Sequence, residues 1–79
     1  MDRNAILERV IEIVLETLDI DDGVEVDEDT SFKGLGADSF DLLELVTTME
    51  DEFDLTFDDE SLETIATVRD AVDAIESVQ

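Results

Sequence analysis

A serine that follows an aspartate at the start of a predicted helix carries the most specific chemistry in this sequence. Ser39 comes directly after Asp38, and Gly34 and Gly36 keep the preceding backbone accessible. Aspartate and serine are both preferred at helix N-termini, so capping alone explains the pair. The hydroxyl also lies at the positive end of the helix, where a phosphate is electrostatically favoured. Local chemistry therefore leaves two roles open for Ser39, a helix cap or a modified serine.

Neither histidine nor cysteine occurs among the 79 residues. Ser39 therefore has no imidazole base in its own chain, and Ser–His–Asp triads and Cys–His dyads are excluded. Disulfides and zinc sites within the chain are excluded for the same reason. If Ser39 is modified, another enzyme must activate its hydroxyl.

Carboxylates dominate the composition, with 25 Asp and Glu against 4 Lys and Arg and a formal net charge of -21. Such a surface repels nucleic acid and anionic lipid, so we expect protein partners with basic patches. It also predicts that salt or Mg²⁺ stabilises the fold. In the acidic loop, neither Asp19 nor Asp27 starts a frame with the glycine and glutamate of a calcium-binding EF-hand loop, so we expect no specific metal site.

The spacing of apolar residues predicts four helices around one thin core. Two long helices are expected at about residues 4–18 and 39–53, a short one at 59–65, and a last one at 68–78. Two apolar runs, at 24–26 and 55–57, are too short to build a sheet. We therefore predict an all-α single domain over residues 1–79, a small four-helix bundle with three main helices, one short helix and a long first loop.

Finer features of these elements also follow from the sequence. We expect Asp38 with Asp41, and Thr67 with Asp70, to form approximate capping boxes. The buried face of the second helix should contain Leu42, Val46, Met49 and Phe53, with Leu43 beside them, and its opposite face Asp41, Glu44, Thr48, Asp51 and Glu52. The expected apolar anchors of the long loop are Val24, Val26, Phe32 and Leu35.

The stretch from Gly36 to Val46, Gly-Ala-Asp-Ser-Phe-Asp-Leu-Leu-Glu-Leu-Val, resembles the modification site of bacterial-type acyl carrier proteins. The resemblance continues through Glu50–Asp54 and Ile65–Val68, and Thr30–Phe32 and Leu35 also fit. It covers essentially the whole chain, although the first helix fits by spacing more than by identity.

The resemblance implies that Ser39 carries a covalent 4'-phosphopantetheine arm, whose thiol holds acyl groups as thioesters. Asp38 would then position the phosphopantetheinyl transferase or its substrate. The acidic residues implied to meet basic patches on the transferase and on acyl-processing enzymes are Asp41, Glu44, Glu50 and Asp51. The residues implied to line an acyl cavity are Leu42, Val46, Leu62, Ile65, Ala71 and Ile75. The protein would be a carrier and not an enzyme.

Three positions depart from the family pattern: Phe40 replaces a leucine, Thr47 an apolar residue, and Phe57 lacks a following proline. Fatty acid biosynthesis is the expected pathway, and a specialised polyketide or D-alanyl carrier is the alternative. An unmodified acidic interaction module and a calcium buffer are hypotheses from other classes. Without a signal-peptide pattern or a bilayer-length apolar run, we expect a cytoplasmic protein that does not insert into membranes, and a monomer.

Overall fold

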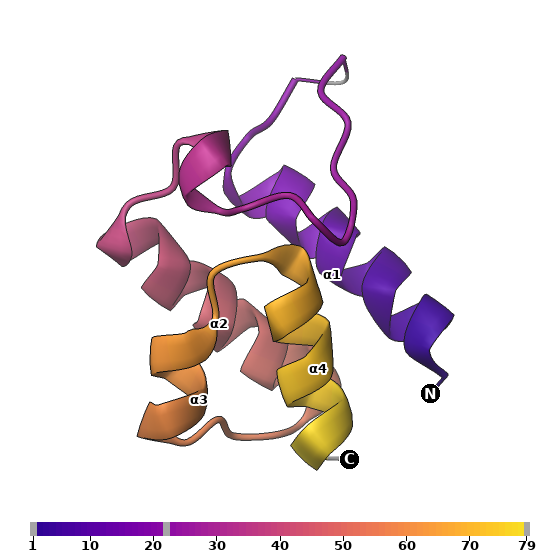
Figure 1. The fold of residues 1–79 in the computed structure, drawn as a ribbon, viewed down its shortest axis with the longest axis vertical. Helices are drawn as coiled ribbons and strands as arrows, with labels where there is room; N and C mark the ends of the chain where they lie inside the picture. The colour runs from indigo at the N-terminus through magenta and orange to yellow at the C-terminus, as the bar shows by residue number, and fades with distance from the viewer. Residues whose placement is uncertain (1, 22, 79) are drawn as a thin grey trace.

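A computed structural model of the chain, describing residues 2–21 and 23–78, consists of helices joined by loops (Figure 1). The helices are α1 (Arg3–Thr17), α2 (Ser39–Phe53), the short α3 (Asp59–Thr64) and α4 (Val68–Val78). A 3-10 turn, η1, spans Lys33–Leu35 within the long first loop. The described residues contain no strand, and their only bridge is an isolated one between Ser31 and Thr67. The predicted all-α fold, with three main helices and one short one, is confirmed.

Side-chain caps explain where the helices begin. Asp38 and Asp41 form a reciprocal capping box at α2, as the sequence predicts. Thr67 and Asp70 exchange the same pair of hydrogen bonds at α4, at 3.2 and 3.1 Å. At α3 the Asp58 side chain accepts a hydrogen bond from the backbone N–H three residues later. These caps satisfy helix N–H groups that have no carbonyl partner within the helix.

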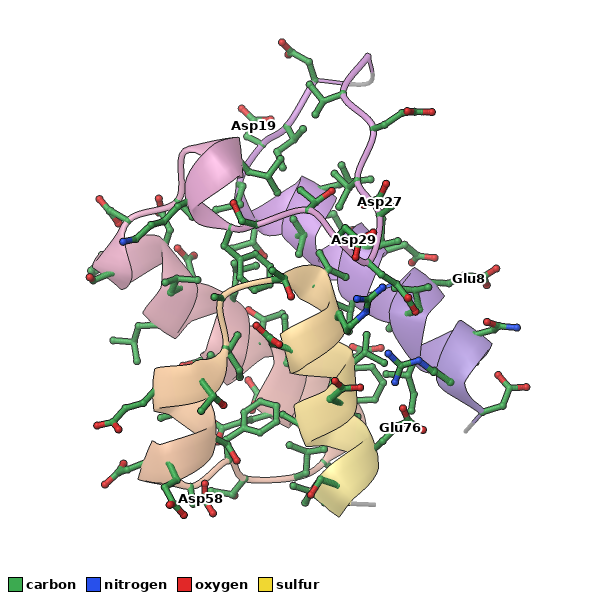
Figure 2. All side chains as sticks on the ribbon, viewed as in Figure 1. Glu8, Asp19, Asp27, Asp29, Asp58 and Glu76 are labelled. Carbon is green, nitrogen blue, oxygen red and sulfur yellow. The ribbon has the colours of Figure 1, made fainter. Side chains whose placement is uncertain are left out.

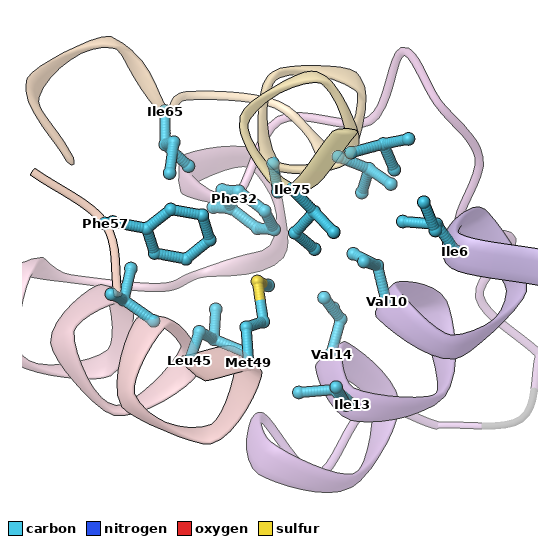
Figure 3. Packing of buried hydrophobic residues seen from close by; sticks show 14 of the residues in the cluster. Ile6, Val10, Ile13, Val14, Phe32, Leu45, Met49, Phe57, Ile65 and Ile75 are labelled. Carbon is cyan, nitrogen blue, oxygen red and sulfur yellow. The ribbon is translucent and has the colours of Figure 1, made fainter. Parts of the chain in front are cut away.

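The core lies where α1, α2 and α4 meet (Figure 3). Helix α1 packs against both α4 and α2, and α3 contributes no fully buried residue. The largest side chains with no more than 2% exposure are Phe32, Ile6, Ile13, Leu45, Met49, Ile75, Val10, Val14, Val68 and Val72. A core of this size is thin, which is typical of chains under 100 residues.

Two expectations about apolar residues are wrong. Leu43 is 60% exposed, and Leu45 at 1% takes the core position instead. At about 100° per residue, Leu43 falls well away from the centre of the face defined by Leu45 and Met49. Val24 is 45% exposed and does not anchor the loop, whereas Phe32 does so as a fully buried ring.

Backbone hydrogen bonds attach the end of the long loop to the segment between α3 and α4. The Phe32 N–H donates to the Ala66 carbonyl at 3.0 Å, and the Val68 N–H donates to the Thr30 carbonyl at 3.1 Å. Together with the bridge from Ser31 to Thr67, these contacts hold the loop across the bundle (Figure 1). These contacts fix residues 30–32, the part of the loop that leads into η1.

All three arginines connect elements that are far apart in the sequence. Arg9 of α1 binds Glu52 of α2 at 2.7 Å. Arg3 joins α1 to Asp73 of α4 at 2.8 Å, and also contacts Glu76 there. Exposed ion pairs of this kind stabilise a fold only slightly, but here they also reduce repulsion within a strongly acidic chain.

The helices of the described residues are too short or too polar to cross a bilayer.

Candidate functional site

Ser39 is the exposed first residue of α2, and Asp38 is its N-cap. The Asp38 Oδ1 accepts a hydrogen bond from the Asp41 N–H at 3.0 Å. The Asp41 Oδ2 accepts one from the Asp38 N–H at 3.3 Å. Because Asp38 and Asp41 cap the helix between them, the Ser39 hydroxyl is not needed for capping. Asp38, and not Ser39, is therefore the residue that caps α2.

The backbone before α2 turns sharply to present Ser39. Gly36 has φ 88°, a left-handed conformation that glycine adopts without steric cost, and its N–H donates to the Lys33 carbonyl. Ala37 is buried, and its N–H donates to the Phe32 carbonyl at 3.0 Å. The buried Phe32 and Ala37 thus fix the end of the loop, and the two residues that follow, Asp38 and Ser39, lie in solvent.

An apolar groove begins beside Ser39. Its first part lies between α2 and α3, and its lining residues are Ser39, Leu42, Leu43, Val46 and Leu62. Its second part shares Leu42 with the first, and its other lining residues are Ser31, Phe32, Lys33, Ile65 and Ala66. Both parts are open to solvent. We call these two adjoining pockets, which have Leu42 in common, the Ser39 groove.

Four of the six predicted cavity residues line the Ser39 groove: Leu42, Val46, Leu62 and Ile65. The other two, Ala71 and Ile75, line neither part of it. Both are fully buried on α4, where Ile75 faces the other core side chains (Figure 3). The family resemblance implies that they line the acyl cavity, and this stays a prediction.

Several groove residues were not expected from the sequence. Phe32 was assigned to the loop as an anchor, and Leu43 to the core, yet both line the Ser39 groove. Lys33 and Ala66 also border it. The spacing within one element could not identify Phe32, Lys33 and Ala66 as groove residues. The second part of the groove forms where the loop meets the segment between α3 and α4, so it depends on the tertiary structure.

The four predicted docking carboxylates differ in their surroundings. Glu44 and Asp51 are exposed on α2, and Asp41 is half-buried in the capping box. Glu50 is half-buried too, and its Oε2 accepts a hydrogen bond from the Phe57 N–H at 2.8 Å. Neighbouring Glu52 binds Arg9, whose hydrogen bond holds the pKa of the Glu52 carboxyl below its ordinary value. Glu44 and Asp51 are therefore the carboxylates most available to a partner.

Exposed carboxylates occur on helices and loops alike, and Glu8, Asp19, Asp58 and Glu76 lie at widely separated places (Figure 2). Within residues 2–21 and 23–78, no three Asp or Glu side chains converge as ligands for a metal ion.

Two apolar side chains are unusually exposed on α2, Phe40 at 74% and Leu43 at 60%. With Glu44, Thr47 and Thr48 they border a shallow hollow next to Ser39. The two threonine hydroxyls donate to the backbone carbonyls of Leu43 and Glu44, each at 2.9 Å. The departures from the expected pattern at Phe40 and Thr47 thus lie together on the outer surface of α2.

A small acidic helical bundle with an exposed serine at a helix N-terminus and an apolar groove beside it has the features that a carrier of a covalently attached group requires. The family described as "Phosphopantetheine attachment site" matches residues 8–75. The crystal structure of an acyl carrier protein from Thermotoga maritima is similar to the chain, with 37% sequence identity and a TM-score of 0.81. The similarity covers 99% of this chain and 91% of that one. The chain therefore belongs to the phosphopantetheine-dependent acyl carrier proteins.

Members of this family carry acyl chains on a covalent 4'-phosphopantetheine and do not catalyse the chemistry of those chains. The residues around Ser39 fit this group. The hydroxyl is exposed for esterification, and a phosphodiester there would lie at the positive end of α2. The groove that begins at Ser39 offers an apolar surface against which an attached hydrocarbon chain could pack. When bound, the group supplies the thiol that a chain without cysteine lacks.

Proposed function

We propose that Ser39 is the attachment point of the 4'-phosphopantetheine and that the protein carries growing acyl chains in fatty acid biosynthesis. The observation that supports this most is the position of Ser39, exposed at the first residue of α2 and adjacent to an apolar groove. Capping by Asp38 leaves the Ser39 hydroxyl free for esterification.

The chain's own residues present the serine and do not activate it. With no histidine in the sequence, removal of the Ser39 proton falls to the transferase. Asp38 fixes the first turn of α2 through its contact with Asp41. Because Asp38 is itself exposed, we also assign it the role of contacting the transferase or its substrate.

The composition of the groove supports a hydrocarbon cargo. Leu42, Val46 and Leu62 offer only alkyl groups to a chain that lies along it. Burying each CH₂ of a ligand there contributes about 0.8 kcal/mol at most, so longer straight chains gain more. A D-alanyl group is short and charged, and gains little from such a surface. The groove therefore favours fatty acyl chains over the D-alanyl alternative.

Partner enzymes should meet the exposed face of α2. We propose Glu44 and Asp51 as the main contacts for basic patches on the transferase and on acyl-processing enzymes, with Asp41 nearer the serine. Charges at the rim of an interface accelerate association and define its orientation. Glu50 lies at the margin of this face, with its carboxylate bonded to the Phe57 N–H.

Residues 1–79 would act as a single carrier domain. We also propose that it acts in the cytoplasm. The charge of -21 makes copies of the chain repel one another, which supports a monomer.

The cargo can be identified directly from cells. The protein is isolated from its own host, its thioesters are cleaved with hydroxylamine, and the released acyl groups are identified by mass spectrometry. A ladder of straight chains that differ by two carbons supports the proposed pathway. Polyketide intermediates or D-alanine as the main released group would assign the protein to a specialised pathway instead.

A further inference from the structure

Glu50 of α2 binds three backbone N–H groups of the segment that leads to α3. Its carbonyl accepts from the N–H of Asp54, the left-handed C-cap of α2, and from the Leu55 N–H at 3.1 Å. Its side-chain Oε2 accepts from the Phe57 N–H at 2.8 Å, seven residues along the chain. One residue thus holds both the end of α2 and the start of the approach to α3.

The contact with Phe57 fixes the entrance of α3. The Phe57 ring is 5% exposed and points into the core near Ile65 and Leu45 (Figure 3). The next residue is Asp58, the N-cap of α3. The backbone that starts α3 is therefore held by a buried ring on one side and by the Glu50 carboxylate on the other.

Helix α3 depends on these attachments at its ends, because it has no fully buried residue of its own. At its other end Ile65 is buried, and the Ala66 carbonyl accepts from the Phe32 N–H. Between the two ends, Leu62 forms the α3 wall of the Ser39 groove opposite Leu42 and Val46. Any shift at the Phe57 end changes the separation of these walls.

The environment of Glu50 also differs from that of a docking carboxylate. Glu44 and Asp51 are exposed, whereas Glu50 is half-buried and already bonded. The nearby Arg9 pairs with Glu52 and Glu12. The observed partner of the Glu50 carboxylate is a backbone N–H within its own chain.

We infer that Glu50 is a positioning residue, which holds α3 through the Phe57 N–H and so sets the width of the groove for the acyl chain. The inference about α3 rests on the geometry alone, and its consequence for the acyl chain rests on the proposed function. A role in partner docking would instead require the negative charge of Glu50 at the surface.

Two conservative substitutions separate these roles. Glu50→Gln removes the charge but keeps an acceptor oxygen at the same reach. Glu50→Asp keeps the charge but withdraws the oxygen by one methylene. Asp51→Ala is the matched control, because it removes a charge from the adjacent exposed position.

The first measurement is amide hydrogen exchange of the unmodified protein by NMR. We expect Glu50→Asp to accelerate exchange at Phe57 and across α3 by about tenfold, the factor for a lost hydrogen bond to a charged acceptor. Exchange in α1 and α4 should stay unchanged in all variants, as should all exchange in Asp51→Ala. Glu50→Gln keeps a neutral acceptor and should accelerate exchange at Phe57 and across α3 less than Glu50→Asp does. Acceleration in Glu50→Gln but not in Glu50→Asp, or equal exchange in all variants, would overturn the inference.

The second measurement compares each variant with and without an octanoyl group on the arm. A purely structural role lowers the melting temperature of both forms equally. A positioning role reduces the rise in melting temperature that octanoylation produces, most strongly in Glu50→Asp. An equal rise in all variants refutes the effect on the groove. If no variant accepts the arm, the proposed function fails, and the exchange data still decide whether Glu50 positions α3.

Discussion

Phe32 and Phe40 illustrate how the same residue type serves two purposes in one small chain. Phe32 is 1% exposed and closes the core beneath the loop, whereas Phe40 is 74% exposed next to Ser39. Phe32 also holds the loop through backbone bonds to Ala66 and Ala37. Stability should therefore depend on Phe32, and partner recognition on Phe40.

Truncation of the two rings tests this difference. Phe32→Ala leaves a cavity in the core and should cost about 3–5 kcal/mol in the free energy of unfolding. Phe40→Ala removes an equal ring from the surface and should change that free energy by less than about 0.5 kcal/mol. Urea unfolding followed by circular dichroism measures both. Equal losses in the two variants would contradict the assignment of Phe32 to the core.

Of the two exposed carboxylates proposed for docking, Glu44 and Asp51, Glu44 is the nearer to Ser39 along α2. Charge reversal in Glu44→Lys should raise the KM of the transferase for this protein by about tenfold, because like charges then face each other across the interface. The increase should shrink as salt is added. Glu8→Lys, on α1, is the control with the same change in net charge. Equal KM values for the two variants would exclude Glu44 from the docking surface.

At the scale of the elements, the helices follow from local signals. Apolar spacing and the caps at Asp38, Asp58 and Thr67 place all four helices within about one residue of the observed bounds. The exposed Leu43 and Val24 were assigned wrongly. Leu43 falls well away from the centre of the buried face of α2, and apolar character alone does not show that a loop residue such as Val24 is covered. The path of the loop was not predictable, since the bonds that fix it join residues 28–32 to 66–69.

In the functional site, too, some features follow from the local sequence and others depend on how distant segments meet. Ser39 and its carboxylate neighbours were predicted as site residues from one contiguous motif. Ala71 and Ile75, which the family resemblance implies as cavity residues, are buried on α4 and line neither part of the Ser39 groove. Their contact with an acyl chain stays a prediction. The bond from Glu50 to the Phe57 N–H depends on how the chain turns after α2, so no helical pattern could indicate it.

Helix α3 should respond to acid through its cap. The Ser61 N–H donates to Asp58 at 2.8 Å, and this bond holds the pKa of the Asp58 carboxyl below its ordinary value of 3.8. A lowered pKa in the folded state means that the ionised cap stabilises the fold above the unfolded pKa. That contribution is lost as the pH falls through the folded pKa.

Asp58→Ala should therefore destabilise the protein at neutral pH, by an amount that declines below about pH 4. Asp59→Ala removes a charge from the adjacent residue without removing the cap, and should show a smaller effect. Thermal unfolding of the three proteins between pH 3 and pH 7 measures the difference. A deficit in Asp58→Ala that grows as the pH falls would contradict the assigned sign.

For the whole molecule, the net charge of -21 is the dominant property. Three arginines reduce repulsion locally by joining distant elements, such as α1 to α2 through Arg9 and Glu52. Most of the other carboxylates among the described residues are exposed to solvent (Figure 2). Repulsion among these carboxylates therefore destabilises the folded state. A partner with a basic patch, or dissolved cations, would reduce this repulsion.

Added salt should raise the melting temperature. Screening at about 0.5 M NaCl acts on the repulsion among 25 acidic residues more than on the few arginine pairs. Mg²⁺ should have the same effect at lower concentration because it carries two charges. Differential scanning calorimetry across a salt series checks both, and a melting temperature that stays constant or falls would refute the charge argument.

The central claim is that Ser39 receives the 4'-phosphopantetheine. The protein is incubated with coenzyme A, Mg²⁺ and a promiscuous phosphopantetheinyl transferase, and its intact mass is then measured. We predict a gain of one phosphopantetheinyl group, which peptide mapping locates at Ser39 and which Ser39→Ala abolishes, while Ser31→Ala retains it. No gain in the wild-type protein, or an undiminished gain in Ser39→Ala, would contradict the account.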